Sequence, residues 1–172
     1  IAALEAAEKK DPDSKETKQL LAQILLMAGR MDEAEDILDG LLTRDPLDKD
    51  ALYTLSLIQG AKKDSKKQKE ILEKIVADSP KDVRANAALG EIYLKQKKYA
   101  EAEKSFAASL EEDPKNLVAL IGKGNVEIRQ GKADQAEKTL TEAIQTEPAY
   151  PFAYVDRSKA RAELGPFSLA DS

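Results

Sequence analysis

The sequence contains no histidine, no cysteine and no tryptophan among its 172 residues. Without cysteine the chain forms neither a disulfide nor a thiolate zinc site. Without histidine it lacks the commonest metal ligand and the side chain that most often acts as a base near neutral pH. We therefore expect no catalytic activity, no metal and no other cofactor. The absence of cysteine leaves the redox state of the compartment open.

Long apolar runs are also missing. The longest nearly apolar stretch, residues 20–29, is interrupted by Gln23, and a bilayer span needs about 20 apolar residues. The sequence does not open on a charged segment followed by an apolar one, so no signal peptide is expected. The chain begins at Ile1 and not at Met, which indicates a processed or excised piece of a longer protein. Cytoplasmic and periplasmic or other extracytoplasmic locations are both compatible.

Charge is abundant and its balance is acidic. Lys and Arg total 27 against 32 Asp and Glu, which gives a formal net charge of −5. Charged residues make up 34% of the chain and hydrophobic residues 42%, a mixture typical of separate charged and apolar faces. Nucleic-acid binding is disfavoured, because it depends on clustered positive charge. The composition favours a binder over a catalyst.

The strongest pattern in the sequence is a repeat. Five of the seven prolines stand 34 residues apart, at Pro12, Pro46, Pro80, Pro114 and Pro148. Proline lacks an amide hydrogen and disfavours helix in the residue before it, so each one marks the end of one helix and the start of the next. Between prolines the apolar residues recur at helical spacing in two runs separated by a polar turn. Each interval therefore predicts an antiparallel pair of helices of about 12–15 residues.

The residue types in these intervals resemble those of the tetratricopeptide repeat (TPR) family. In the third interval Leu89-Gly90 and Tyr93 match the family's first helix, and Ala102, Phe106 and Pro114 match its second helix. The resemblance implies an all-α fold, a right-handed α-solenoid of stacked antiparallel helix pairs. Small residues would lie where helices approach closely, and large ones would fill the gaps between pairs.

Placing position 1 of each repeat three residues after each proline divides the whole chain into repeats. We expect one solenoid with four full repeats, at 15–48, 49–82, 83–116 and 117–150. Residues 1–14 would end a preceding repeat, 151–165 would form a further or capping helix, and 166–172 would be a tail. Because the frame is cut at both ends, we expect a fragment of a longer array.

The second repeat departs most from the pattern. Gln59, Gly60 and Lys63 replace the family's usual tyrosine and turn glycine, and Gln68 stands where a small alanine belongs. A glutamine at a close helix contact needs a hydrogen-bond partner or more space. We expect looser packing there.

The fourth repeat carries charges where the family has large apolar residues. Lys123 and Glu127 take these places, and Arg157 and Arg161 take the equivalent places in the next helix. One reading is a polar recognition site. We favour the other, an ion pair of Glu127 with Arg157 or Arg161, because charges at an interface are normally paired.

In the TPR family the first helix of each pair lines a concave groove, and the resemblance implies that positions 2, 5, 9, 12 and 13 face it. Phe152, Val155 and Lys159 extend this row into the last helix. The mixture of apolar and polar groups suits an extended or helical peptide, with apolar pockets supplying affinity and charges setting the register. The expected site residues are Gln19, Gln23, Met27, Tyr53, Leu57, Arg84, Glu91, Leu94, Lys95, Ile121, Asn125, Ile128 and Arg129.

Three functions follow from this reading. The first is a non-catalytic scaffold that binds a peptide or protein segment of unknown identity in the groove. The second is a self-associating solenoid that builds homo-oligomers through exposed repeat ends or the tail. The third, an RNA-binding helical repeat, is disfavoured by the acidic balance. The carboxylate clamp of chaperone-binding TPR proteins is absent, since Ile121 and Asp156 stand where its Lys and second Asn belong.

Overall fold

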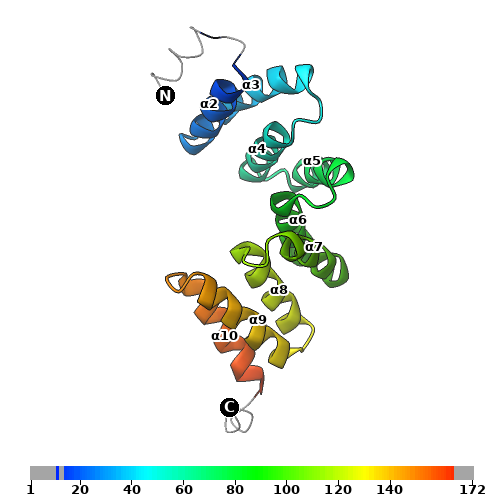
Figure 1. The fold of residues 1–172 in the computed structure, drawn as a ribbon, viewed down its shortest axis with the longest axis vertical. Coiled ribbons are helices and arrows are strands. Elements are labelled where there is room, and N and C mark those ends of the chain that lie inside the picture. Colours follow the sequence, from blue (N-terminus) through cyan, green and yellow to red (C-terminus); the bar gives the residue numbers. More distant parts are fainter. Residues whose placement is uncertain (1–10, 12–13, 165–172) are drawn as a thin grey trace. The chain divides into compact units, whose positions relative to one another are not determined.

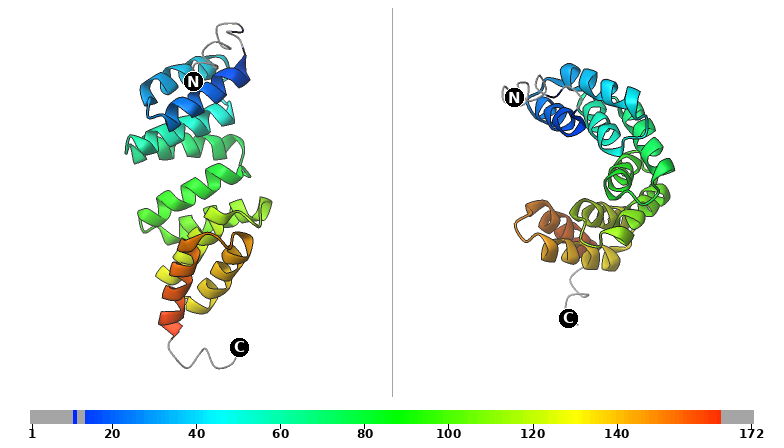
Figure 2. Two further views of the ribbon diagram at one scale, coloured as in Figure 1. Left: turned by 90° about the vertical axis from the view of Figure 1, so that its left-hand side faces the viewer. Right: turned by 45° about the horizontal axis from the view of Figure 1, so that its top comes forward.

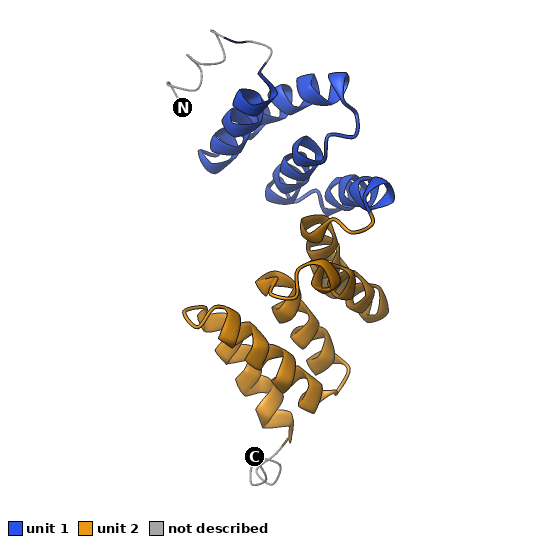
Figure 3. Ribbon diagram, viewed as in Figure 1, with its two compact units in different colours: residues 1–79 blue, residues 80–172 orange. Residues whose placement is uncertain are grey.

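The computed structural model describes residues 11 and 14–164. This part of the chain forms nine helices joined by short turns and contains no strand, in agreement with the predicted all-α repeat fold. The chain divides into two compact units, residues 1–79 and 80–172 (Figure 3). The helix expected before residue 14 and the tail 166–172 lie outside the described residues. No helix among residues 14–164 combines the length and apolar character needed to cross a membrane.

Unit 1 contains two helix pairs (Figure 1). Helix α2 (Lys15–Met27) packs on α3 (Met31–Arg44), and α4 (Lys49–Ala61) packs on α5 (Ser65–Asp78). Each pair falls inside one of the predicted 34-residue windows. A continuous apolar cluster joins α2, α3 and α4 and includes Leu21, Ala22, Leu25, Ala34, Leu38, Leu41, Ala51 and Ile58.

Unit 2 contains two further pairs and a single helix. Helix α6 (Val83–Lys95) packs on α7 (Tyr99–Glu112), and α8 (Leu117–Arg129) packs on α9 (Ala133–Thr146). Helix α10 (Pro151–Leu164) contacts both α9 and α8. The views in Figure 2 show the helices of each pair side by side. The first helices α6, α8 and α10 therefore follow one another within this unit.

The same capping chemistry recurs at the start of the first helices α2, α4, α6 and α8. The side chains of Ser14, Asp48, Asp82 and Asn116 accept hydrogen bonds from first-turn backbone amides, at 3.2, 3.1, 2.9 and 3.0 Å. Such caps satisfy amides that the helix itself leaves unpaired. The second helices end two residues before Pro46, Pro80, Pro114 and Pro148. The spacing of caps and prolines thus explains the regular helix boundaries.

The turn between the two helices of a repeat needs a left-handed backbone conformation. Gly29 and Gly131 adopt it with φ of 76° and 72°, and Lys63 and Lys97 adopt it with φ of 63° and 60°. These four residues are spaced 34 apart. Side chains with a Cβ are strained in this conformation, whereas glycine is not. The second and third repeats therefore store strain in their turns.

Close helix contact in unit 2 depends on two glycines that face one aromatic ring. Phe106 of α7 is completely buried. A Cβ at Gly90 of α6 would lie 2.5 Å from Phe106 Cε1, and a Cβ at Gly122 of α8 would overlap the same ring. The ring thus occupies space that the missing side chains of two successive repeats leave open.

The glutamine that departs from the pattern in the second repeat is also accommodated by a glycine. A Cβ at Gly60 of α4 would lie 2.7 Å from Gln68 Nε2 of α5. Gly60 therefore provides the space that Gln68 takes up, and the larger residue is compensated across the helix pair. Leu72 and Ile75, further along α5, are fully buried.

Substitution of Gly122 by alanine should lower the free energy of unfolding by about 1–3 kcal/mol, because the new methyl group overpacks against Phe106. Gly40→Ala is the matched control, since a Cβ at Gly40 meets nothing within 4 Å inside α3. That change should raise the free energy of unfolding by about 0.5–1 kcal/mol through helix propensity. Urea unfolding measures both, and equal effects of the two changes would contradict the packing argument.

Substitution of Lys97 by glycine should raise the free energy of unfolding by about 1 kcal/mol, because the left-handed strain disappears. The reciprocal change, Gly131→Lys at the equivalent turn, should lower it by a similar amount. Thermal unfolding followed by circular dichroism tests the pair. If Lys97→Gly destabilises the chain, the turn is held by interactions of the lysine and not strained.

Candidate functional site

The expected groove residues of unit 1 lie on the two first helices of that unit. Met27 and Leu57 are exposed, with 87% and 40% of their surface accessible, and Gln23 is exposed as well. Tyr53 and Gln19 are half-buried. The row thus has accessible members on both α2 and α4.

Gln19 has a structural partner within unit 1. Its Nε2 lies 3.1 Å from each carboxylate oxygen of Asp48, the buried cap of α4. Lys15 Nζ also binds Asp48, at 2.9 Å. Burial alone would raise the pKa of Asp48, but the hydrogen bonds from Lys15 and from the first-turn amides outweigh it and lower the pKa. Gln19 therefore links the two helix pairs of this unit.

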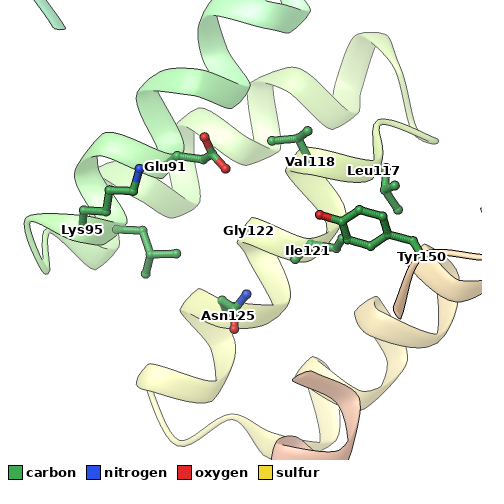
Figure 4. A pocket seen from close by; sticks show the side chains of 9 residues that line it. Glu91, Lys95, Leu117, Val118, Ile121, Gly122, Asn125 and Tyr150 are labelled. Carbon is green, nitrogen blue, oxygen red and sulfur yellow. The ribbon is translucent and has the colours of Figure 1, made fainter. Parts of the chain in front are cut away.

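Unit 2 has a pocket where α6, α8 and the turn before α10 come together (Figure 4). Its volume is about 200 Å³. The predicted site residues Glu91, Leu94, Lys95, Ile121 and Asn125 contribute to its lining. Of the other predicted residues in this unit, Arg84 and Arg129 are exposed and Ile128 is half-buried, and all three lie outside the pocket.

Three lining residues, Leu117, Gly122 and Tyr150, do not hold one of the expected groove positions. Val118 occupies a groove position of the repeat, and Leu117 and Gly122 are its near neighbours on α8. Tyr150 comes from the turn before α10. Figure 4 shows its ring beside Ile121 with the hydroxyl directed toward the middle of the pocket.

The pocket lining combines apolar and polar groups. Leu94, Leu117, Val118 and Ile121 supply apolar surface, and Glu91, Lys95 and the Tyr150 hydroxyl supply polar groups. Figure 4 shows most of these side chains. Such a combination binds an apolar group and orients it through a few polar contacts.

Asn125 at the pocket edge is oriented by a hydrogen bond to the next first helix. Its Nδ2 donates to Asp156 Oδ2 at 2.9 Å, and Asp156, only 9% exposed, also accepts from Lys159 Nζ at 2.7 Å. Because the amide nitrogen is engaged, Asn125 Oδ1 is left as an acceptor. Asp156 occupies the place of the second clamp asparagine, and here it orients Asn125.

Glu127, also on α8, is a buried acid with incomplete hydrogen bonding. It is 4% exposed, and within the described part of the chain its Oε2 has no hydrogen-bond partner. Lys123 Nζ lies 3.9 Å from Oε1. Burial raises the pKa of Glu127, Glu103 adds to this effect, and Thr139, Lys123 and Lys132 oppose it.

The predicted ion pair of Glu127 with Arg157 or Arg161 is wrong. Arg161 Nε binds Glu137 Oε1 at 2.5 Å, and Arg157 Nη1 lies 3.5 Å from Thr141 Oγ1. The reason is the register of the repeats: this first-helix position faces an acid located 24 residues earlier in the chain. The equivalent contact in unit 1 joins Gln59 Nε2 to Glu35 Oε1 at 2.6 Å.

Among residues 11 and 14–164 no group of three or more acidic, histidine or cysteine side chains is arranged to hold a metal ion. The pocket of unit 2 is the candidate site because five of the predicted site residues line it.

Two family models match the sequence, and each is described as a tetratricopeptide repeat. One matches residues 1–58 and 94–162, and the other matches residues 69–116. No curated protein matches the chain.

Solved structures of repeat proteins have the same fold. A tetratricopeptide repeat protein of Parabacteroides merdae is 21% identical, with a TM-score of 0.75 over 95% of this chain, which spans 65% of that protein. YrrB, a TPR protein with an unusual peptide-binding site, is 18% identical, with a TM-score of 0.72 over 93% of this chain and 82% of its own. Pseudomonas aeruginosa pilF is 19% identical, with a TM-score of 0.75 over 86% of this chain and 72% of its own.

Glu127→Gln should stabilise the chain at neutral pH by about 1 kcal/mol, because it removes a poorly paired buried charge. The raised pKa means that the folded state binds more protons than the unfolded state, so stability falls as pH rises through and above about 4.3. The gain should therefore vanish at lower pH. Urea unfolding across pH measures it, with Glu142→Gln on the exposed surface of α9 as control. A gain independent of pH would contradict this account.

Proposed function

The chain belongs to the tetratricopeptide repeat family, and on that premise we propose that it is a non-catalytic protein-binding scaffold. In this proposal a peptide or protein segment binds along the first helices of unit 2. The observation that carries it is the pocket between α6, α8 and Tyr150, where five predicted groove residues meet. Members of this family generally act as protein-interaction scaffolds, which supports the same conclusion.

The size and lining of the pocket favour a side chain of a protein over a metabolite. Its volume of about 200 Å³ is below the roughly 300–1,000 Å³ of small-molecule sites. An apolar side chain inserted between Leu94, Val118 and Ile121 would lose its contact with water, and such buried anchors dominate the energy of protein interfaces.

Asn125 adds a polar contact suited to a peptide backbone. The hydrogen bond to Asp156 holds its Nδ2, so its Oδ1 can accept from a backbone amide beside the anchoring side chain. A peptide as the occupant is supported by YrrB, a structural neighbour described as a TPR protein with an unusual peptide-binding site. The fixed amide limits the side-chain entropy lost on binding.

Val118→Asp should weaken binding of a selected peptide at least tenfold, about 1.4 kcal/mol. The probes are short peptides selected from a random display library on the 172-residue chain and then measured by fluorescence anisotropy. Leu47→Asp is the matched control, because Leu47 and Val118 are both 47% exposed and Leu47 does not line the pocket. A second variant, Tyr150→Ser, removes a pocket wall while restoring a capping residue, so lost binding cannot be ascribed to unfolding. Selected peptides that bind Val118→Asp and Tyr150→Ser as tightly as the parent chain would refute the proposal.

A further inference from the structure

The apolar surface of unit 2 continues beyond the pocket onto α10. Tyr150, Phe152 and Val155 expose 36%, 62% and 52% of their surface. The rings of Tyr150 and Phe152 pack with centroids 5.6 Å apart. Because Tyr150 also lines the pocket, the aromatic pair connects the pocket to α10. Phe152 and Val155 hold the same repeat positions as Val118 and Ile121, so this surface follows the N-terminal halves of two successive first helices.

Positive charge lies at the C-terminal ends of the first helices α6 and α8. Lys95 is the last residue of α6 and Arg129 the last residue of α8, one repeat apart, and both are exposed. Neither forms an ion pair with any residue in the described part of the chain. Lys159, which holds a groove position on α10, forms an ion pair with Asp156. Glu91 is the one acid of the pocket lining, one helical turn before Lys95.

Helix-end chemistry alone does not explain these two cations. A cation in the last turn does favour a helix, because it offsets the helix dipole. However, the equivalent residues of unit 1 are Met27 and Ala61. The two cations therefore occur in the unit whose first helices also carry the pocket and the exposed aromatic pair.

From this arrangement we infer that the surface recognises an extended protein segment with a large apolar side chain and acidic side chains three or four residues away. The inference rests on the proposed function. The apolar side chain would pack at the pocket and against Tyr150 and Phe152, and the acidic groups would face Lys95 and Arg129. Arg129 follows Ile121 by eight positions in the sequence, which corresponds to about 12 Å along the helix. An extended chain covers that distance in about three or four residues.

The experiment uses the same random display library and the full chain. Selected peptides are synthesised with acetylated and amidated ends, so that only side chains carry charge. We expect them to pair an aromatic or aliphatic residue with acidic residues at the stated spacing, in either order. Replacing the acidic residues by Asn or Gln should weaken binding about fivefold, the effect of exposed ion pairs. High salt should weaken it similarly.

Charge reversal supplies the decisive comparison. The double variant Lys95→Glu/Arg129→Glu should lose at least tenfold in affinity for these peptides and should gain affinity for analogues with lysine at the acidic positions. The matched control is Lys104→Glu/Lys138→Glu. It introduces the same charge at two exposed residues, also one repeat apart, on the second helices α7 and α9 of the same repeats. The control should bind as the parent chain does.

The other outcomes separate this inference from the proposed function. One outcome is that Val118→Asp weakens peptide binding while Lys95→Glu/Arg129→Glu and Lys104→Glu/Lys138→Glu bind equally well. That result would overturn the inference of an acidic partner and leave the proposed scaffold function standing. Binding only when the peptide keeps a free terminal carboxylate would overturn the assignment to side chains. Self-association of the chain in sedimentation, abolished by Val118→Asp, would identify a second copy as the occupant and overturn the inference. Peptide binding that is insensitive to both Val118→Asp and Tyr150→Ser would overturn the proposed function and this inference together.

Discussion

The contact of Phe106 with two glycines sets the geometry of unit 2. The ring lies against Gly90 of one first helix and Gly122 of the next, so it fixes how closely α6 and α8 approach α7. Glu91 follows Gly90 directly, and Ile121 precedes Gly122. The positions of these pocket residues therefore depend on a buried ring that does not itself line the pocket. A side chain at either glycine would overlap the ring and displace its helix, together with the pocket residue beside it.

Most of the fold follows from local rules that the sequence displays. The prolines end the second helices, and Ser14, Asp48, Asp82 and Asn116 start the first ones. Tyr150 breaks this series at the position where the fifth cap belongs. An aromatic residue in place of a capping residue is the sequence feature that marks Tyr150, which lines the pocket. The resemblance to the family places Glu91, Leu94, Lys95, Ile121 and Asn125 on the groove side of the first helices, and these five residues line the pocket.

Contacts between successive repeats could not be predicted in the same way. Gln19 and Asp48 are far apart in sequence, and so are Asn125 and Asp156. Helical periodicity gives the face of a side chain but not the residue it meets on a neighbouring pair. Glu127 shows the consequence, since opposite charge suggested an arginine, whereas the register of stacking places it near Glu103. In unit 1 the equivalent residues are Glu35 and Gln59, and the amide of Gln59 donates a hydrogen bond to Glu35. Glu127 thus replaces an amide donor by a second acid.

This register has a consequence for how such chains change by recombination. Glu35 meets both Gln59 and Lys62, whereas the equivalent residues around Glu103 are Glu127 and Gln130. The apolar contacts are similar from repeat to repeat, but the polar contacts differ at each junction. Deleting residues 83–116 would replace Phe106 by Leu72 at the equivalent position and bring Lys69 to the place of Glu103, opposite Glu127. Loss or duplication of one repeat therefore rewrites the charge pairing at the new junction, and neighbouring repeats are matched to one another and are not interchangeable modules.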